Sequence, residues 1–276
     1  MHVWLDDSLV DAQEARVSVS DGGLIVGTGV FETMKVVDGT PFALTRHLER
    51  LARSAAALDI PVPASDILVG AMDAVISANA NAVGAGGRLR LTLTSGPAAV
   101  GDPYSVTGAP TLLITLVASK PWPATATVVD SPFARNELGA LAGVKSTSYA
   151  ENAIALRAAR RQGADEAILY NTRGQLCEGT GSNVFLVVAG EILTPPLTSG
   201  CLDGVTRQLV LEWCGAREAV IDDTVMADAT EAFLTSSTRD VHPIEIWGER
   251  RFPGVAGKVT AAARRVWQER SADLDP

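Results

Sequence analysis

A single lysine stands among small and apolar residues near the middle of the chain. Lys145 follows Gly143-Val144 and precedes Ser146-Thr147-Ser148, in a chain with only four lysines against nineteen arginines. A lysine partly withdrawn from water has a lowered pKa and can attack carbonyl groups as an amine, forming a Schiff base. Because most lysines are solvated surface charges, the surrounding sequence must decide which role Lys145 has.

Carboxylate and hydroxyl groups stand in three later segments. Glu178 precedes Gly179-Thr180-Gly181-Ser182, Thr206 follows Leu202-Asp203-Gly204-Val205, and Thr235-Ser236-Ser237-Thr238 follows an apolar strand pattern. Glycines let a backbone approach a bound group closely, and the N–H groups at the start of a helix bind phosphate. Taken singly, a glutamate in a turn is normally solvated, and a hydroxyl cluster is a common loop feature.

The order of these segments resembles the class IV aminotransferase family, the fold-type IV pyridoxal-phosphate enzymes. The resemblance rests on Val144 to Asn152, Ala164 to Tyr170 and Glu178 to Phe185, and it runs from Asp21 to about Pro243. This family includes branched-chain and D-amino-acid transaminases and 4-amino-4-deoxychorismate lyase. The resemblance implies pyridoxal 5′-phosphate as the cofactor, held by Lys145 as an internal aldimine.

The resemblance also implies roles for individual residues. Glu178 matches the glutamate beside the ring nitrogen of the cofactor, and Arg50, in a His-x-x-Arg-Leu pattern, matches an arginine that binds the phosphate. A guanidinium fork suits a phosphate dianion. Lys145 and Glu178 are the expected catalytic residues. The expected cofactor-binding residues are Arg50, Lys145, Glu178, Leu202, Val205, Thr206, Ser236 and Ser237.

Substrate-facing residues are expected on strand patterns and in the hydroxyl cluster. In Gly27-Thr28-Gly29-Val30-Phe31-Glu32 the position of the third glycine of a dinucleotide-binding fingerprint holds Glu32, which excludes that fold. The similar family segment lines the substrate pocket, so Phe31 and Glu32 are candidates, with an ordinary strand as the alternative. Arg90 is a candidate for the substrate carboxylate, against a solvated charge on an exposed face. Thr238 is the remaining candidate.

Composition excludes several classes of function. The net charge of −9 argues against nucleic acid as a partner, because phosphate backbones need a basic surface. We expect no membrane association and a cytoplasmic protein, because no apolar stretch approaches the length of a membrane span and no basic-then-apolar leader is present. The cysteines, Cys177, Cys201 and Cys214, have no metal-site spacing. The expected partner is a small-molecule amine.

The sequence predicts an α/β chain of two domains. Residues 1–118 form a small N-terminal α+β domain, 119–124 a proline-stiffened interdomain linker and 125–276 a larger C-terminal domain. The resemblance adds a barrel-like sheet in the second domain, a cofactor between the domains and a homodimer. Local patterns predict a helix over 45–58 capped by Thr45, and a helix after Lys145 with a Ser148/Glu151 capping box that stops at Gly163.

Two enzymatic functions and one binding function fit these residues. The short chain and the Lys145-Ser146-Thr147-Ser148-Tyr149 stretch favour 4-amino-4-deoxychorismate lyase, which makes p-aminobenzoate and pyruvate in folate synthesis. A transaminase for D-amino or branched-chain amino acids is the alternative. The loop Gly96 to Asp102 matches neither the lyase pattern nor the D-amino-acid transaminase pattern. A non-catalytic relative is the third hypothesis, and a protein that takes up no pyridoxal phosphate would support it.

Overall fold

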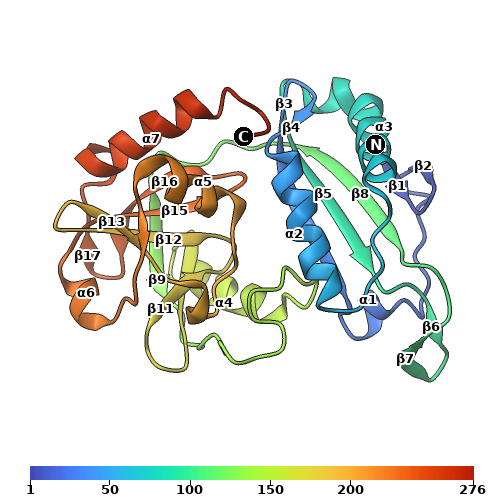
Figure 1. Cartoon of the computed structure of the whole chain (residues 1–276), viewed down its shortest axis with the longest axis horizontal. Helices are drawn as coiled ribbons and strands as arrows, with labels where there is room; N and C mark the ends of the chain where they lie inside the picture. Colours follow the sequence, from blue (N-terminus) through green and yellow to red (C-terminus); the bar gives the residue numbers. More distant parts are fainter. The chain divides into compact units, whose positions relative to one another are not determined.

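The computed structural model describes residues 1–276 as two compact units (Figure 1). Unit 1 comprises Met1–Lys120, Val144–Ser148 and Leu274–Pro276, and unit 2 comprises Pro121–Gly143 and Tyr149–Asp273. The chain first passes from unit 1 to unit 2 inside the predicted linker 119–124. The segment that carries Lys145 then returns to unit 1, which the sequence pattern did not predict.

Unit 1 is built on an antiparallel six-stranded sheet with the order β2-β1-β8-β5-β3-β4. In β5 the side chains of Leu89, Leu91 and Leu93 are fully buried while those of Arg88 and Arg90 are exposed, which confirms the predicted alternation. The strands of this sheet are β1 (His2–Leu5), β2 (Ser8–Asp11), β3 (Gly29–Val37), β4 (Thr40–Pro41), β5 (Gly86–Thr94) and β8 (Leu112–Ala118).

Two long helices cover the sheet of unit 1: α2 (Leu44–Ala56) packs on β3, and α3 (Ser65–Val83) packs on β8 and β1. The unit also contains α1 (Gly22–Ile25) and the hairpin β6 (Ala98–Ala99) and β7 (Asp102–Val106). The predicted N-cap at Thr45 is wrong. Its backbone N–H and hydroxyl both donate to the carboxylate of Asp275, so a group 230 residues away takes the place of a local cap.

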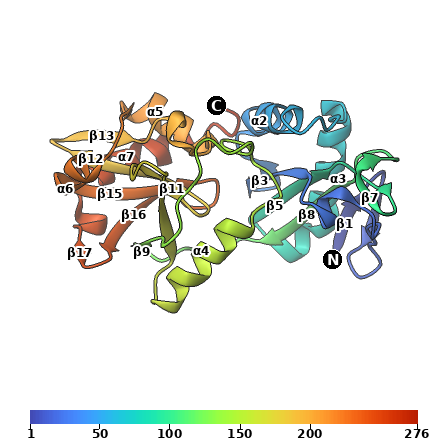
Figure 2. The same cartoon turned by 90° about the horizontal axis from the view of Figure 1, so that it is seen from below.

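Unit 2 contains a nine-stranded mixed sheet with the order β11-β10-β9-β16-β15-β12-β13-β14, and β17 beside β16 (Figure 2). Strand β9 runs parallel to β10 and β16, and β12, β15 and β16 are antiparallel neighbours. The sheet curls into a half-barrel, as predicted. The strands are β9 (Ala126–Asp130), β10 (Glu166–Tyr170), β11 (Leu176–Gly179), β12 (Asn183–Val188), β13 (Glu191–Thr194), β14 (Arg217–Glu218), β15 (Ala229–Ser236), β16 (Asp240–Trp247) and β17 (Arg250–Arg251).

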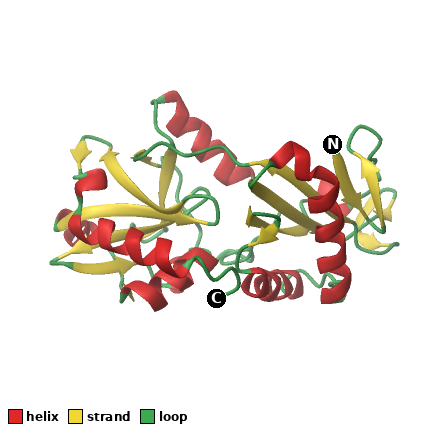
Figure 3. Cartoon of the chain, turned by 90° about the horizontal axis from the view of Figure 1, so that it is seen from above, coloured by secondary structure: helices red, strands yellow, loops and turns green.

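The helices of unit 2 appear in red in Figure 3. They are α4 (Ala150–Arg161), α5 (Val205–Cys214), α6 (Asp223–Ala227) and α7 (Lys258–Arg270), with short 3-10 turns at Leu197–Ser199 and Gly254–Ala256. Gly163, with φ +77°, follows the end of α4 as predicted. The predicted capping box is wrong, because Tyr149 precedes α4 and the Ser148 hydroxyl donates to the carbonyl of Gly27. No helix is both long and apolar enough to cross a membrane.

Candidate active site

Lys145 lies on a segment that backbone hydrogen bonds fasten to the start of β3. The N–H of Phe31 donates to the carbonyl of Lys145 at 3.0 Å, and the N–H of Thr147 donates to the carbonyl of Gly29 at 2.7 Å. The N–H of Lys145 itself donates to the hydroxyl of Ser54 at 3.2 Å. These bonds hold the half-buried amine beside β3, with its Nζ 4.3 Å from the centroid of the Phe31 ring.

Arg90 reaches the same aromatic ring as Lys145. Its guanidinium carbon lies 3.8 Å from the centroid of the Phe31 ring, and its Nε donates to the hydroxyl of Thr92 at 3.2 Å. An aromatic face attracts such cations, and β5 pairs directly with β3, so the strand register brings the two side chains together. The structure thus places three predicted site residues, Phe31, Arg90 and Lys145, in one cluster of unit 1.

Glu32 and Arg50 form a buried ion pair in unit 1. Arg50 donates from Nε to one carboxylate oxygen of Glu32 at 2.8 Å and from Nη2 to the other at 2.6 Å. The Nδ1 of His47 lies 2.6 Å from the same carboxylate. Glu32 is fully buried. Burial alone would raise its pKa, but Arg50 and then His47 outweigh that effect, and the pKa of Glu32 lies far below its usual value.

This ion pair orients the arginine that is predicted to bind phosphate. The two hydrogen bonds that Arg50 donates to Glu32 fix the plane of its guanidinium, which has five N–H donors in a rigid fork. The carboxylate of Glu32 contacts Arg50 and His47, and these contacts fix the positions of both side chains. Its role toward the substrate stays a prediction, as does the phosphate role of Arg50.

Glu178 lies on β11 in unit 2 and is only 8% exposed. One carboxylate oxygen accepts a hydrogen bond from the N–H of Leu202 at 2.9 Å, and the other lies 3.4 Å from Nη2 of Arg135. Both contacts favour the ionised carboxylate. A charged carboxylate held in a nearly dry site is suited to pair with a protonated ring nitrogen.

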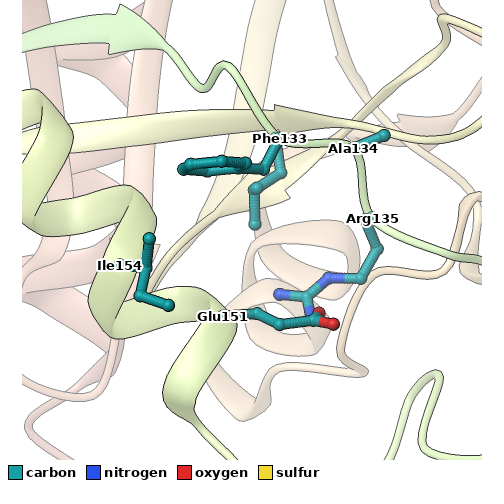
Figure 4. Close-up of a pocket in the computed structure, with 6 residues that line it drawn as sticks. Phe133, Ala134, Arg135, Glu151 and Ile154 are labelled. Carbon is teal, nitrogen blue, oxygen red and sulfur yellow. The ribbon is translucent and has the colours of Figure 1, made fainter.

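Arg135 is a partner of Glu178 that sequence reasoning missed. Its guanidinium also donates to the side-chain oxygen of Asn152 at 3.2 Å and faces the carboxylate of Glu151 at 3.7 Å (Figure 4). Arg135 and Glu151 border a pocket of about 180 Å³ whose other walls are Phe133, Ala134, Ile154 and Leu169. In the sequence Arg135 is one of nineteen arginines, in an irregular loop, so no periodicity sets it apart.

The start of α5 and the nearby hydroxyl groups fit a phosphate. No side chain caps α5, so the N–H groups of its first turn, at Val205 and Thr206, are not used by a local cap. The side chain of Asn183 donates to the carbonyl of Leu202 at 2.8 Å and fixes the approach to the helix. A Cβ at Gly204 would lie 2.0 Å from Oδ1 of Asn183, so any larger residue here would displace the Asn183 side chain.

A second group of hydroxyls lies where β15 turns into β16. Ser236 ends β15, and Ser237 and Thr238 follow it before β16 begins at Asp240. The neighbouring Thr235 has a buried hydroxyl oxygen without any hydrogen-bond partner, and an unsatisfied polar atom of this kind is costly unless a ligand or water meets it. Strand β15 pairs with β12, which begins at Asn183, so sheet pairing links this turn to the approach of α5.

The two units together carry the features of a pyridoxal-phosphate enzyme: a lysine amine held at a strand, a desolvated carboxylate, and a helix start with hydroxyl groups. Residues 29–247 match the family model described as amino-transferase class IV. The chain therefore belongs to the class IV aminotransferase family. Its members use pyridoxal 5′-phosphate, so the chain is a pyridoxal-phosphate enzyme.

Curated relatives differ in their named activities. A protein of Methanocaldococcus jannaschii provisionally named a branched-chain-amino-acid aminotransferase is 30% identical over 98% of this chain and 96% of its own length. The D-alanine aminotransferase of Bacillus licheniformis is 29% identical, with 97% and 96% covered. The aminodeoxychorismate lyase of Bacillus subtilis is 27% identical, with 97% and 94% covered.

The fold agrees with a solved structure. The branched-chain amino acid aminotransferase of Escherichia coli superposes with a TM-score of 0.86 at 26% identity, covering 99% of this chain and 94% of the other. This agreement confirms the predicted fold class. Lys145, Arg50 and Phe31 lie in unit 1, and Glu178, Leu202, Val205, Thr206, Ser236, Ser237 and Thr238 lie in unit 2. Their individual roles stay predictions.

Proposed function

We propose that this enzyme is a transaminase that moves the amino group of a D-amino acid or a branched-chain amino acid to a 2-oxo acid. The observation that carries the proposal is the position of Arg90 and Lys145 on one aromatic ring, at 3.8 and 4.3 Å from the centroid of Phe31. Amino donors and 2-oxo acid acceptors both carry a carboxylate next to the reacting carbon. A guanidinium this near the amine suits that carboxylate.

In the proposed reaction the named residues hold the cofactor and move one proton. Bound pyridoxal 5′-phosphate supplies an electron sink for the bonds at the amino-bearing carbon. Lys145 would hold the cofactor through its carbonyl group, and the Lys145 amine, once free, would take the proton from the amino-bearing carbon of the substrate and later give that proton back. Glu178 keeps the ring nitrogen protonated, with Arg135 holding its carboxylate. Arg50, Thr206 and Ser237 bind the phosphate.

The names of the relatives support the transaminase over the lyase that the sequence favoured. Of the three relatives described above, the two with the highest identity are named aminotransferases. The lyase remains a second candidate because an aminodeoxychorismate lyase matches 97% of the chain. In that reaction Lys145 would remove the same proton, and the substrate would lose pyruvate and leave p-aminobenzoate, a folate precursor.

Two assays separate these candidates. The cofactor-loaded protein is given a panel of D- and L-amino acids with 2-oxoglutarate, and separately freshly made aminodeoxychorismate. We expect glutamate and a new 2-oxo acid in the first assay and no p-aminobenzoate in the second. Release of p-aminobenzoate without amino transfer would establish the lyase instead.

Variants of two arginines on one strand test the carboxylate role. Arg90→Met should raise the KM for the amino donor by about tenfold or more, because a lost charge-assisted bond to a carboxylate is worth on the order of 1.5–3 kcal/mol. Arg88→Met is the matched control, since Arg88 is also exposed on the same face of β5. Equal effects of the two variants would contradict the assignment of Arg90.

A homodimer and a cytoplasmic location remain part of the proposal, and light scattering would measure the oligomeric state.

A further inference from the structure

Glu166 is a buried carboxylate at the start of β10 that the proposed reaction does not use. It is 3% exposed. It accepts a hydrogen bond from the N–H of Thr180 at 3.1 Å, a second from the hydroxyl of Thr180, and a third from the hydroxyl of Ser182 at 3.2 Å. Thr180 and Ser182 belong to the turn that directly follows Glu178. Glu166 therefore fastens the turn next to the predicted ring-nitrogen partner.

Arg239 forms a buried ion pair with Glu166. Its Nη2 lies 3.5 Å from the Glu166 carboxylate, and its side chain is only 4% exposed. Arg239 is the last residue of the turn that contains Ser236, Ser237 and Thr238, and its own N–H donates to the carbonyl of Ser236 at 3.1 Å. One buried ion pair thus connects the turn of Thr180 and Ser182, which follows Glu178, with the turn of Ser236, Ser237 and Thr238, here called the hydroxyl turn.

Two more groups hold the guanidinium of Arg239 in place. The Nε2 of His242 lies 2.8 Å from the carbonyl of Pro123, and a carbonyl only accepts, so Nε2 carries the hydrogen. The other ring nitrogen then accepts from Nη1 of Arg239 at 3.0 Å, which requires a neutral histidine. The ring of Trp122 covers the guanidinium at 3.6 Å. The cation is therefore fixed on three sides, by a carboxylate, an imidazole and an indole.

We propose that Glu166 and Arg239 are positioning residues that set the distance between Glu178 and the hydroxyl turn of Ser236, Ser237 and Thr238. Glu178 is predicted to bind the ring nitrogen, and Ser236 and Ser237 are predicted to bind the phosphate. The ion pair therefore determines how well the protein binds both ends of the cofactor at the same time. The inference rests on the proposed function only through cofactor binding. Neither residue touches the reacting atoms.

The physical consequence differs between the two ends of the cofactor. If one member of a buried pair is removed, an uncompensated buried charge remains. We expect the element that is held by fewer contacts to shift. Arg239 belongs to the hydroxyl turn itself, whereas Glu166 lies on β10, which is paired on both sides, with β11 and with β9. Loss of Arg239 should therefore disturb phosphate recognition more than recognition of the pyridine ring.

Binding of two ligands by the apo-protein separates these effects. Wild type, Arg239→Gln, Glu166→Gln and the double variant are titrated with pyridoxal 5′-phosphate and with pyridoxal, which lacks the phosphate. We expect Arg239→Gln to lower the preference for the phosphorylated ligand by about tenfold, the equivalent of about one charge-assisted contact. The double variant should lose little more than either single variant, because the two residues act as a pair.

A purely structural role would weaken both ligands equally and leave their ratio unchanged. Arg217→Gln is the matched control, because Arg217 also pairs with a glutamate in unit 2, at 2.7 Å from Glu191, but is exposed. Arg239→Lys keeps the positive charge but lacks the forked guanidinium, so it should still lower the ratio of the affinities for pyridoxal 5′-phosphate and pyridoxal. It replaces Arg239→Gln if that variant does not fold. An unchanged ratio in either folded variant would overturn the inference. Wild type that binds neither ligand would instead overturn the proposed function.

Discussion

Replacement of Glu32 tests whether its buried ion pair supports unit 1. The Glu32 carboxylate is fully buried and meets Arg50 at 2.6 and 2.8 Å and His47 at 2.6 Å. In Glu32→Ala the buried Arg50 guanidinium loses the carboxylate of Glu32. Removal of one member of such a pair costs about 3–5 kcal/mol.

The expected change in melting temperature follows from the size of the chain. At about 2.1 cal/mol/K per residue, cooperative unfolding of 276 residues has an entropy of about 0.6 kcal/mol/K. A loss of 3–5 kcal/mol then lowers the melting temperature by about 5–9 °C, and by more if unit 1 unfolds separately. Differential scanning calorimetry and urea denaturation of the apo-protein measure both quantities.

A matched pair of variants isolates the effect of the buried charge. Glu32→Gln keeps the volume and removes the charge, and Glu49→Gln makes the same change at an exposed position of α2. We expect Glu49→Gln to stay within about 0.5 kcal/mol of wild type. A loss below about 1 kcal/mol in Glu32→Ala would refute the reasoning, because it would mean that Arg50 finds another partner or water.

Three other predictions concern the cofactor site and pH. Glu178→Gln should fold and bind cofactor but lose about 100-fold or more in turnover; near-full activity would remove its proposed role. Gly204→Ala should weaken binding of pyridoxal 5′-phosphate by about tenfold in a spectroscopic titration, since the added Cβ lies 2.0 Å from Asn183 Oδ1; unchanged affinity would contradict the phosphate assignment of α5. Burial, and next the charge of Arg239, lower the pKa of His242. Below about pH 6.5 the unfolded chain therefore binds a proton that the folded chain does not, and the free energy of unfolding decreases as the pH is lowered. Urea denaturation should show a smaller fall between about pH 7 and 5 for His242→Gln, and an identical fall would count against this linkage.

Features that depend on local pattern could be predicted from the sequence. The leucines of β5 alternate with arginines, and the structure buries the leucines and exposes the arginines. The order of the segments Val144 to Asn152, Ala164 to Tyr170 and Glu178 to Phe185 was sufficient to predict the family and its cofactor. Each of these signals lies within a short segment or in the order of segments along the chain.

Features that depend on distant contacts could not be predicted. The helix start at Thr45 uses the carboxylate of Asp275, and no local pattern predicts that partner. Strand alternation allowed Glu32 to face a pocket, but the structure buries it against Arg50, because both faces of β3 are covered at that point. Arg135 and the Glu166–Arg239 pair were missed for the same reason, since their importance comes from side chains that the fold brings together.

The most direct test of the central claim follows amino transfer by wild type and Lys145→Ala, both loaded with pyridoxal 5′-phosphate. The proposed function predicts that wild type absorbs visible light through its lysine-bound cofactor and forms glutamate from 2-oxoglutarate with at least one D-amino or branched-chain donor. Lys145→Ala should fold but lose both the visible band and the transfer. A visible band that persists in Lys145→Ala, or a folded, cofactor-loaded wild type that transfers no amino group from any donor, would contradict the account.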